Sequence, residues 1–222
     1  MILSPLRAAE FDGVAAAFAA GLADDPLAAA VFAAILRVPP PGDLATLSTD
    51  PRHHAEAVEL CRSFGFGLLD LAPQDHFTWD GAAVAIRIEP SVLIHEIGHY
   101  QLAAPARRGL YDFGLGAGPE TGRKAEADAV QALFLPERDV EEGLCSLLGI
   151  LWEADLGQPA VLALLEQNWL EGGASPRNLA HFRKIVRWLA AMGLIDPATA
   201  RPTRALRQED DRDFFARWYR EG

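Results

Sequence analysis

The stretch EPSVLIHEIGHYQ, residues 89–101, constrains the fold of this chain more than any other part. It contains two histidines, His95 and His99, four positions apart, and most of the residues around them are apolar. Positions i and i+4 of an α-helix share one face, so the two imidazoles would point in the same direction. The apolar residues indicate that this helix is buried. The sequence therefore predicts an interior helix that presents His95 and His99 together.

The HExxH spacing is typical of a metal centre. Glu96 is rotated by about 100° from His95 on a helix, which places it beside the open side of an ion held by the histidines. In zinc peptidases a glutamate at this position acts as the general base. Gly98 would let another backbone approach the helix closely. The alternative is an amphipathic helix whose histidines make polar contacts in the core, but the apolar helix and the β-rich segment before it favour a metal site.

A third ligand is needed, because two histidines leave a metal site incomplete. The downstream carboxylates that could supply it are Glu120, Glu126, Asp128, Asp139, Glu141 and Glu142. A metzincin would have glycine at 102 and histidine at 105, where this chain has Leu102 and Pro105, so that subclass is excluded. A gluzincin-like glutamate on a later helix stays open, with Glu126 and Glu141 as candidates.

Residues 95–123, HEIGHYQLAAPARRGLYDFGLGAGPETGR, are similar to the bacterial elongation factor P hydroxylase family. That family has an HExxH-type start, a basic ARR pair, a DFG triplet and a PDGR-like turn, which correspond here to residues 95–99, 106–108, 112–114 and 119–123. Residues 139–160 resemble the family's DVE helix, after an insertion before residue 139. The resemblance implies an iron(II) site formed by His95, His99 and Glu141.

This resemblance implies an iron(II)-dependent hydroxylase that acts on a lysine-derived side chain of a translation-factor protein or on a small cationic substrate. Glu96 would then orient a water, a ligand or the substrate amine. A first alternative is a zinc-dependent HExxH metallopeptidase or other hydrolase, with Glu96 as the base. A second is a non-catalytic metal-binding module. The net charge of −11 is compatible with a cationic substrate, although such acidity ordinarily serves solubility.

Several other polar residues could belong to a catalytic or metal site, but their sequence contexts favour structural roles. Arg107 and Arg108 follow the motif helix, and one of them is expected to pair with Asp112 or a nearby carboxylate. Cys145 lies one helical turn after Glu141 and is expected to pack as a small hydrophobe. Histidines outside the motif are expected at the surface, at a strand end or on a basic helical face; these are His53, His54, His76 and His181.

Charge and composition exclude some classes of protein. The net charge of −11 argues against a nonspecific nucleic-acid binder, because phosphate contacts need lysine and arginine. The sequence contains no run of about 18 apolar residues, so it predicts no membrane-spanning helix. Cys61 and Cys145 form no disulfide framework, and we expect a cytoplasmic protein. Residues 176–222 are basic, which indicates a solvated face or a tail that docks on an acidic partner or on the acidic body of its own chain.

The predicted fold is α+β, mostly helical, with a small β-sheet packed beside the HExxH helix. We expect a single metal-dependent domain over residues 1–222, with 176–222 as a basic helical C-terminal extension. Two short β-like segments, 66–72 and 82–88, are expected to pair as neighbours. A proline-rich stretch at 38–43 should end the second helix. The oligomeric state is not predicted. The expected helices lie at about 11–22, 26–37, 51–64, 90–104, 124–134, 139–155, 159–170, 177–192 and 209–219.

Overall fold

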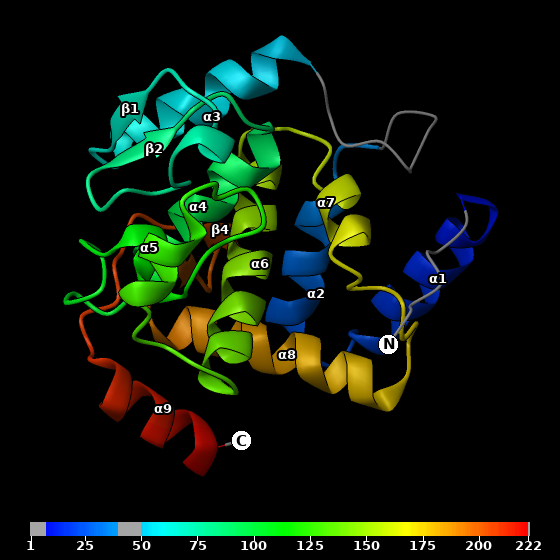
Figure 1. Ribbon diagram of the computed structural model, residues 1–222. Coiled ribbons are helices and arrows are strands. Elements are labelled where there is room, and N and C mark those ends of the chain that lie inside the picture. Colours follow the sequence, from blue (N-terminus) through cyan, green and yellow to red (C-terminus); the bar gives the residue numbers. More distant parts are fainter. Residues whose placement is uncertain (1–7, 40–49, 222) are drawn as a thin grey trace. The chain divides into compact units, whose positions relative to one another are not determined.

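The computed structural model describes residues 8–39 and 50–221, which are mostly helical with two small pairs of strands (Figure 1). This confirms the predicted α+β class. The described residues divide into two compact units, one formed by 8–39, 50–53 and 146–203 and the other by 54–145 and 204–221. None of the described helices combines the length and the apolar run that crossing a bilayer requires. Most of the proline-rich stretch at 38–43 lies outside the described residues.

The first unit is mostly helical, and two of its helices begin with side-chain caps. Its elements are α1 (Ala8–Gly21), α2 (Pro26–Ile35), the part of α6 (Glu137–Asp155) from residue 146 onward, α7 (Val161–Glu166), α8 (Pro176–Ala191), β3 (Ile195–Asp196) and β4 (Arg201–Pro202). Both α2 and α8 have proline in the first turn, where no amide hydrogen is needed. The side chains of Asp25 and Ser175 cap these two helices by accepting hydrogen bonds from main-chain amides.

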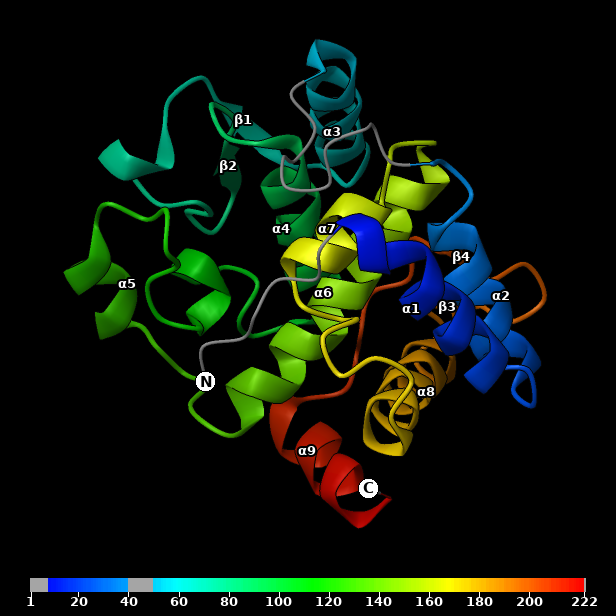
Figure 2. The same ribbon diagram turned by 90° about the vertical axis from the view of Figure 1, so that its right-hand side faces the viewer.

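Aromatic side chains form the centre of this first unit. Phe18 of α1, Phe32 of α2 and Phe182 of α8 are almost fully buried. The Phe18 and Phe32 ring centroids are 4.9 Å apart, and Phe182 meets both rings edge-on, an arrangement that aromatic pairs prefer. The helices α2 and α8 therefore pack side by side, as Figure 2 shows.

The second unit contains the motif helix. Its elements are α3 (Pro51–Ser63), β1 (Gly67–Leu69), β2 (Ala83–Ala85), α4 (Pro90–Leu102), α5 (Lys124–Ala129), the first half of α6 and α9 (Asp211–Arg220), with 3-10 turns at Pro73–Asp75 and Tyr111–Gly114. Strands β1 and β2 pair in parallel, with Leu68 opposite Val84, which confirms their predicted pairing. Phe66, directly before β1, packs against Tyr100 of α4 with 4.8 Å between ring centroids, so the sheet lies beside the motif helix.

Helices α4 and α6 approach each other closely at Gly98. A Cβ atom at this position would lie 2.8 Å from Cys145 Sγ and 3.1 Å from the Cys145 carbonyl oxygen. Real side chains do not tolerate the first distance, so only glycine allows this approach. The prediction that Gly98 admits another backbone is therefore confirmed. The neighbouring Leu93, Ile94 and Ile97 are fully buried, as the apolar pattern predicted.

The segment 176–222, predicted as a C-terminal extension, divides between the two units. Residues 176–203 supply buried side chains to the first unit, including Phe182 and Trp188. Residues 204–221 belong to the second unit, where the Arg207 guanidinium contacts the acidic side chains of Glu141 and Asp211. The prediction of a single domain over the whole chain stays a prediction.

A buried glutamate in the first unit should make stability depend on pH. Burial, with Glu166 nearby, raises the pKa of Glu153 to about 8. An unfolded glutamate titrates near pH 4.3, so between about pH 4.3 and 8 the unfolded state releases this proton before the folded state does, and stability falls as pH rises. We expect Glu153→Gln to match the wild type at pH 4.5 and to exceed its unfolding free energy by up to about 5 kcal/mol at pH 8.

Urea titrations at the two pH values measure this difference. Asp139→Asn, at an exposed position of the same helix, is the control and should change stability by less than about 0.5 kcal/mol at either pH. An equal gap between wild type and Glu153→Gln at both pH values would show that Glu153 does not titrate abnormally.

Candidate metal centre

Helix α4 presents His95 and His99 together, as their spacing predicted. Their ring centroids are 4.7 Å apart and the ring planes are nearly perpendicular. The His95 side chain is 24% exposed, whereas that of His99 is 6% exposed. Solvent can therefore reach the His95 imidazole, whereas the His99 imidazole is enclosed by protein.

The carboxylate of Glu142, on α6, faces both histidines. Its Oε2 atom lies 3.4 Å from His95 Nε2 and 3.6 Å from His99 Nε2. These distances are long for hydrogen bonds. They are close to the ~3.3 Å that separates neighbouring nitrogen and oxygen ligands of a tetrahedral ion with bonds of about 2.0–2.1 Å. Because the Glu142 side chain is 44% exposed, the three groups also leave an open side.

The protonation states of these groups suit a metal ion. Burial lowers the pKa of His99 to about 3, so its ring is neutral at neutral pH. Burial by itself would raise the pKa of Glu142, but the imidazoles of His99 and His95 lower it to about 2. Metal ligands have to be deprotonated, and a neutral imidazole and an ionised carboxylate meet that need. The residues present therefore fit a divalent ion.

Glu141, the ligand implied by the family resemblance, has different partners. Its buried carboxylate accepts hydrogen bonds from Arg107 Nη1, at 3.2 Å, and from Arg107 Nη2. Successive residues on a helix are rotated by about 100°, so Glu141 and Glu142 face different directions. The structure thus places Glu142, and not Glu141, against the histidines. This arrangement also confirms that Arg107 pairs with a nearby carboxylate, although Asp112 is not that carboxylate.

The remaining downstream carboxylates are occupied elsewhere or exposed. Glu126 is exposed and pairs with Arg123, with 2.7 Å between Oε1 and Nε. Asp128 accepts a hydrogen bond from the amide of Ala117, and Asp139 is exposed. Glu120 lies close enough to Glu96 to influence its ionisation. Apart from Glu142, these residues supply no contact to the histidines within the described chain.

Cys145 is the other potential ligand beside the two histidines. One ligand atom from each of His95, His99 and Cys145 lies within 4.8 Å of the others. The Cys145 thiol, however, donates a hydrogen bond to the His95 carbonyl oxygen at 3.1 Å. Burial, with the charges of Glu142 and Glu96, raises the pKa of this thiol well above its usual range. A metal binds the thiolate and not the thiol, so Glu142 is the better third ligand.

Glu96 lies in an acidic and buried environment. Its side chain is 8% exposed, and burial raises its pKa well above the usual value. The charges of Asp112, Glu142 and Glu120 raise it further. Two histidines surrounded by carboxylates in the protein interior form a site where a bound cation would offset the mutual repulsion.

The DFG segment supports the site with an aromatic ring. Asp112 and Phe113 both have positive φ angles, 43° and 55°, and the Asp112 carboxylate accepts hydrogen bonds from the Trp79 amide and the Thr121 hydroxyl. This turn directs the Phe113 ring onto His99, with 5.7 Å between centroids, and onto Trp79. Phe113 and Trp79 were not predicted as supports of the site, because aromatic residues by themselves do not indicate a metal centre.

The histidines outside the motif have partners of their own. His54 Nε2 contacts a main-chain carbonyl oxygen at 2.7 Å, and His76 Nε2 lies 3.6 Å from Asp80. His181 stacks on Trp169 with 5.4 Å between ring centroids. His54, expected at the surface, is half-buried, and His76, expected at a strand end, follows the 3-10 turn at Pro73–Asp75. His181 is exposed on α8, as expected.

Comparisons of this chain with protein-family models, with curated proteins and with solved structures found no match. Its function is therefore inferred from the geometry of this site together with the sequence resemblance.

The ligand set can be tested by measuring metal affinity. We expect Glu142→Ala to weaken Co(II) or Zn(II) binding by more than about 100-fold, because changes to residues that merely support a ligand already cost about 10- to 100-fold. Isothermal titration calorimetry on protein freed of metal gives the affinities. Glu126→Ala, which removes an exposed carboxylate, is the matched control and should leave them unchanged. If Glu142→Ala binds as the wild type does while Glu141→Gln does not bind, Glu141 is the ligand.

Proposed function

We propose that this protein is a non-heme iron(II)-dependent hydroxylase whose metal ligands are His95, His99 and Glu142. The observation that carries the proposal is the position of Glu142 Oε2, 3.4 Å and 3.6 Å from the two imidazole nitrogens. Two histidines and one carboxylate that leave coordination positions open are the ligand set of non-heme iron(II) oxygenases. Iron(II), when bound, would supply the activation of dioxygen for oxidising a C–H bond.

The contacts of Arg107 support the resemblance to the hydroxylase family. The ARR, DFG and DVE motifs lie apart in the sequence, yet Arg107 Nη1 donates hydrogen bonds both to the Phe113 carbonyl oxygen, at 2.7 Å, and to Glu141. Phe113 in turn stacks on His99. Motifs that meet beside one metal centre are better support for shared chemistry than the HExxH pentapeptide alone, because chemistry resides in the site.

Each residue of the site has a part in this reaction. His95, His99 and Glu142 hold the ion. Burial and the neighbouring carboxylates raise the pKa of Glu96, which can donate a hydrogen bond to the substrate or orient a water. The Phe113 ring covers one side of the His99 ring and excludes water there.

A cationic substrate suits the charges around the site. Glu96, Asp112 and Glu120 lie near one another, and the whole chain carries a net charge of −11. The partial exposure of His95 and Glu142 leaves an approach for a long side chain. We propose a lysine-derived side chain on a cytoplasmic translation-factor protein as the substrate class, with a small cationic molecule as the alternative.

A zinc-dependent hydrolase is the second candidate, and the spacing of the ligand atoms favours it. The separations of 3.4 Å and 3.6 Å are those of a tetrahedral site, the usual geometry of zinc. In this reaction Glu96 would take the proton from the attacking water. A raised pKa suits a general base as well as a hydrogen-bond donor, so the pKa of Glu96 is compatible with both reactions. We place the hydrolase second because the sequence resemblance favours the hydroxylase.

The metal and the cosubstrate distinguish the two reactions. We expect protein purified without air to contain iron. We expect its iron(II) form, supplied with a two-electron reductant, to insert one atom of dioxygen into a C–H bond of a protein or peptide carrying a basic side chain, while the other atom is reduced to water, and only when oxygen is present. The zinc form should add none. Mass spectrometry of substrates incubated with and without oxygen provides the measurement, and elemental analysis provides the metal content.

Glu96→Gln provides the control. We expect this variant to retain the metal, and we expect neither it nor the wild type to cleave an unstructured peptide. A general base contributes about 10²- to 10⁴-fold to a rate, so peptide cleavage by the wild-type zinc form that drops by this factor in Glu96→Gln would establish the hydrolase instead. Metal binding without either activity would indicate a non-catalytic module.

A further inference from the structure

Arg107 uses every donor of its guanidinium group. The group has five N–H donors. Arg107 Nε and Nη2 bind the two carboxylate oxygens of Asp211 at 2.6 Å and 3.1 Å. Nη1 donates to the Phe113 carbonyl oxygen and to Glu141 Oε1, and Nη2 also donates to Glu141 Oε2. The side chain is 3% exposed, so it is a buried hub that joins three segments of the second unit.

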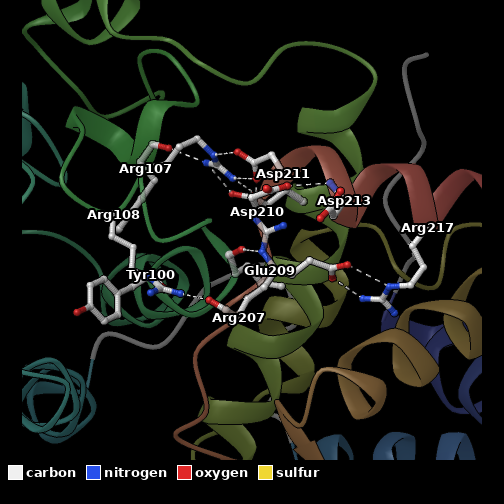
Figure 3. A network of polar contacts seen from close by, with 12 residues as sticks. Tyr100, Arg107, Arg108, Arg207, Glu209, Asp210, Asp211, Asp213 and Arg217 are labelled. Carbon is white, nitrogen blue, oxygen red and sulfur yellow. Dashed lines mark hydrogen bonds and ion pairs between the residues drawn. The ribbon is translucent and has the colours of Figure 1, made fainter.

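The C-terminal segment supplies Asp211, one of the two carboxylates that Arg107 binds. Figure 3 shows Asp211, at the start of α9, between Arg107 and Arg207. Arg207 Nη2 donates to Asp211 Oδ1 at 2.5 Å, and Arg207 Nε donates to the carbonyl oxygen of Leu102. The Arg207 amide also donates to the Gln101 carbonyl oxygen at 2.8 Å. The residues that lead into α9 are thereby attached to the last turn of α4, two and three positions beyond His99.

Two of the groups that Arg107 holds are connected directly to the metal ligands. Phe113, whose carbonyl oxygen it binds, stacks on His99. Glu141, whose carboxylate it binds, is the residue directly before Glu142 on α6, so a displacement of Glu141 would move Glu142 as well. Supporting residues of this kind orient metal ligands and commonly change affinity when altered.

We propose that Asp211 is a positioning residue of the metal centre, acting through Arg107 on Phe113 and Glu141. The inference rests on the proposed ligands His95, His99 and Glu142. Arg107 and Arg207 share the two carboxylates of Asp211 and Glu141, so the buried charges balance. Removing the charge of Asp211 takes away two hydrogen bonds from Arg107 to an anion. We expect Arg107, and the Glu141 carboxylate that it binds, to shift as a result.

The test measures Co(II) binding to the full chain, by the dissociation constant and by the visible absorption of the bound ion, which reports ligand geometry. We expect Asp211→Asn to weaken Co(II) binding by about 10- to 100-fold and to change the absorption spectrum. Arg107→Lys should do the same, because an ammonium group keeps the charge but cannot form the planar fork. Since Arg107→Lys leaves the charge balance intact, it carries the test if Asp211→Asn does not fold.

Two variants serve as controls. Asp213→Asn lies on the same helix, at an exposed position, and should bind Co(II) as the wild type does. Asp211→Glu retains the carboxylate and should recover much of the affinity lost in Asp211→Asn. A role confined to folding would lower the melting temperature without moving the spectrum of the bound ion.

The outcomes separate this inference from the proposed function. Wild-type affinity and spectrum in both Asp211→Asn and Arg107→Lys would overturn the positioning role, while binding that is lost in Glu142→Ala would leave the metal centre standing. A wild-type chain that binds no Co(II) would overturn the ligand assignment, and the positioning role with it.

Discussion

The close approach of α4 and α6 at Gly98 is the contact on which the candidate site depends. With no side chain at this position, α6 comes so close that a Cβ atom would lie 2.8 Å from Cys145 Sγ and 3.1 Å from the Cys145 carbonyl oxygen. That approach brings Glu142, less than one turn earlier on α6, against the two histidines of α4. A larger residue at 98 would require Cys145 to shift, and a shift of α6 there would move Glu142 relative to the imidazoles.

Two adjacent glutamates on α6 illustrate how surroundings assign roles to identical groups. Glu141 is buried and held by guanidinium groups, which compensate its charge. Glu142 is partly exposed and faces the two imidazoles, and its lowered pKa leaves it ionised at neutral pH. A carboxylate whose charge is already compensated by arginine binds a metal weakly. A carboxylate beside neutral imidazoles keeps its negative charge available for a metal. The arginine that satisfies Glu141 therefore helps to leave Glu142 as the ligand.

The ligands do not choose between iron and zinc, since two imidazoles and one carboxylate suit both ions and availability in the cell governs occupancy. Burial and the neighbouring carboxylates raise the pKa of Glu96, which suits a general base as well as a hydrogen-bond donor. The identity of the bound metal therefore decides the chemistry of a motif that many enzymes share.

The sequence by itself determined the approximate positions of the helices, the pairing of the two short strands and the shared face of His95 and His99, because these follow from local periodicity and from prolines at helix starts. The predicted helices 124–134 and 159–170 were too long, since α5 ends at Ala129 and α7 at Glu166. The sequence did not decide between Glu141 and Glu142, because that depends on the rotation of α6 about its axis, which packing at Gly98 and the hydrogen bonds of Arg107 set. Nor did it indicate that Asp211 binds Arg107, because the two residues lie 104 positions apart. Contacts between residues so far apart produce no recognisable pattern in a single sequence, because only the tertiary structure brings the two charges together.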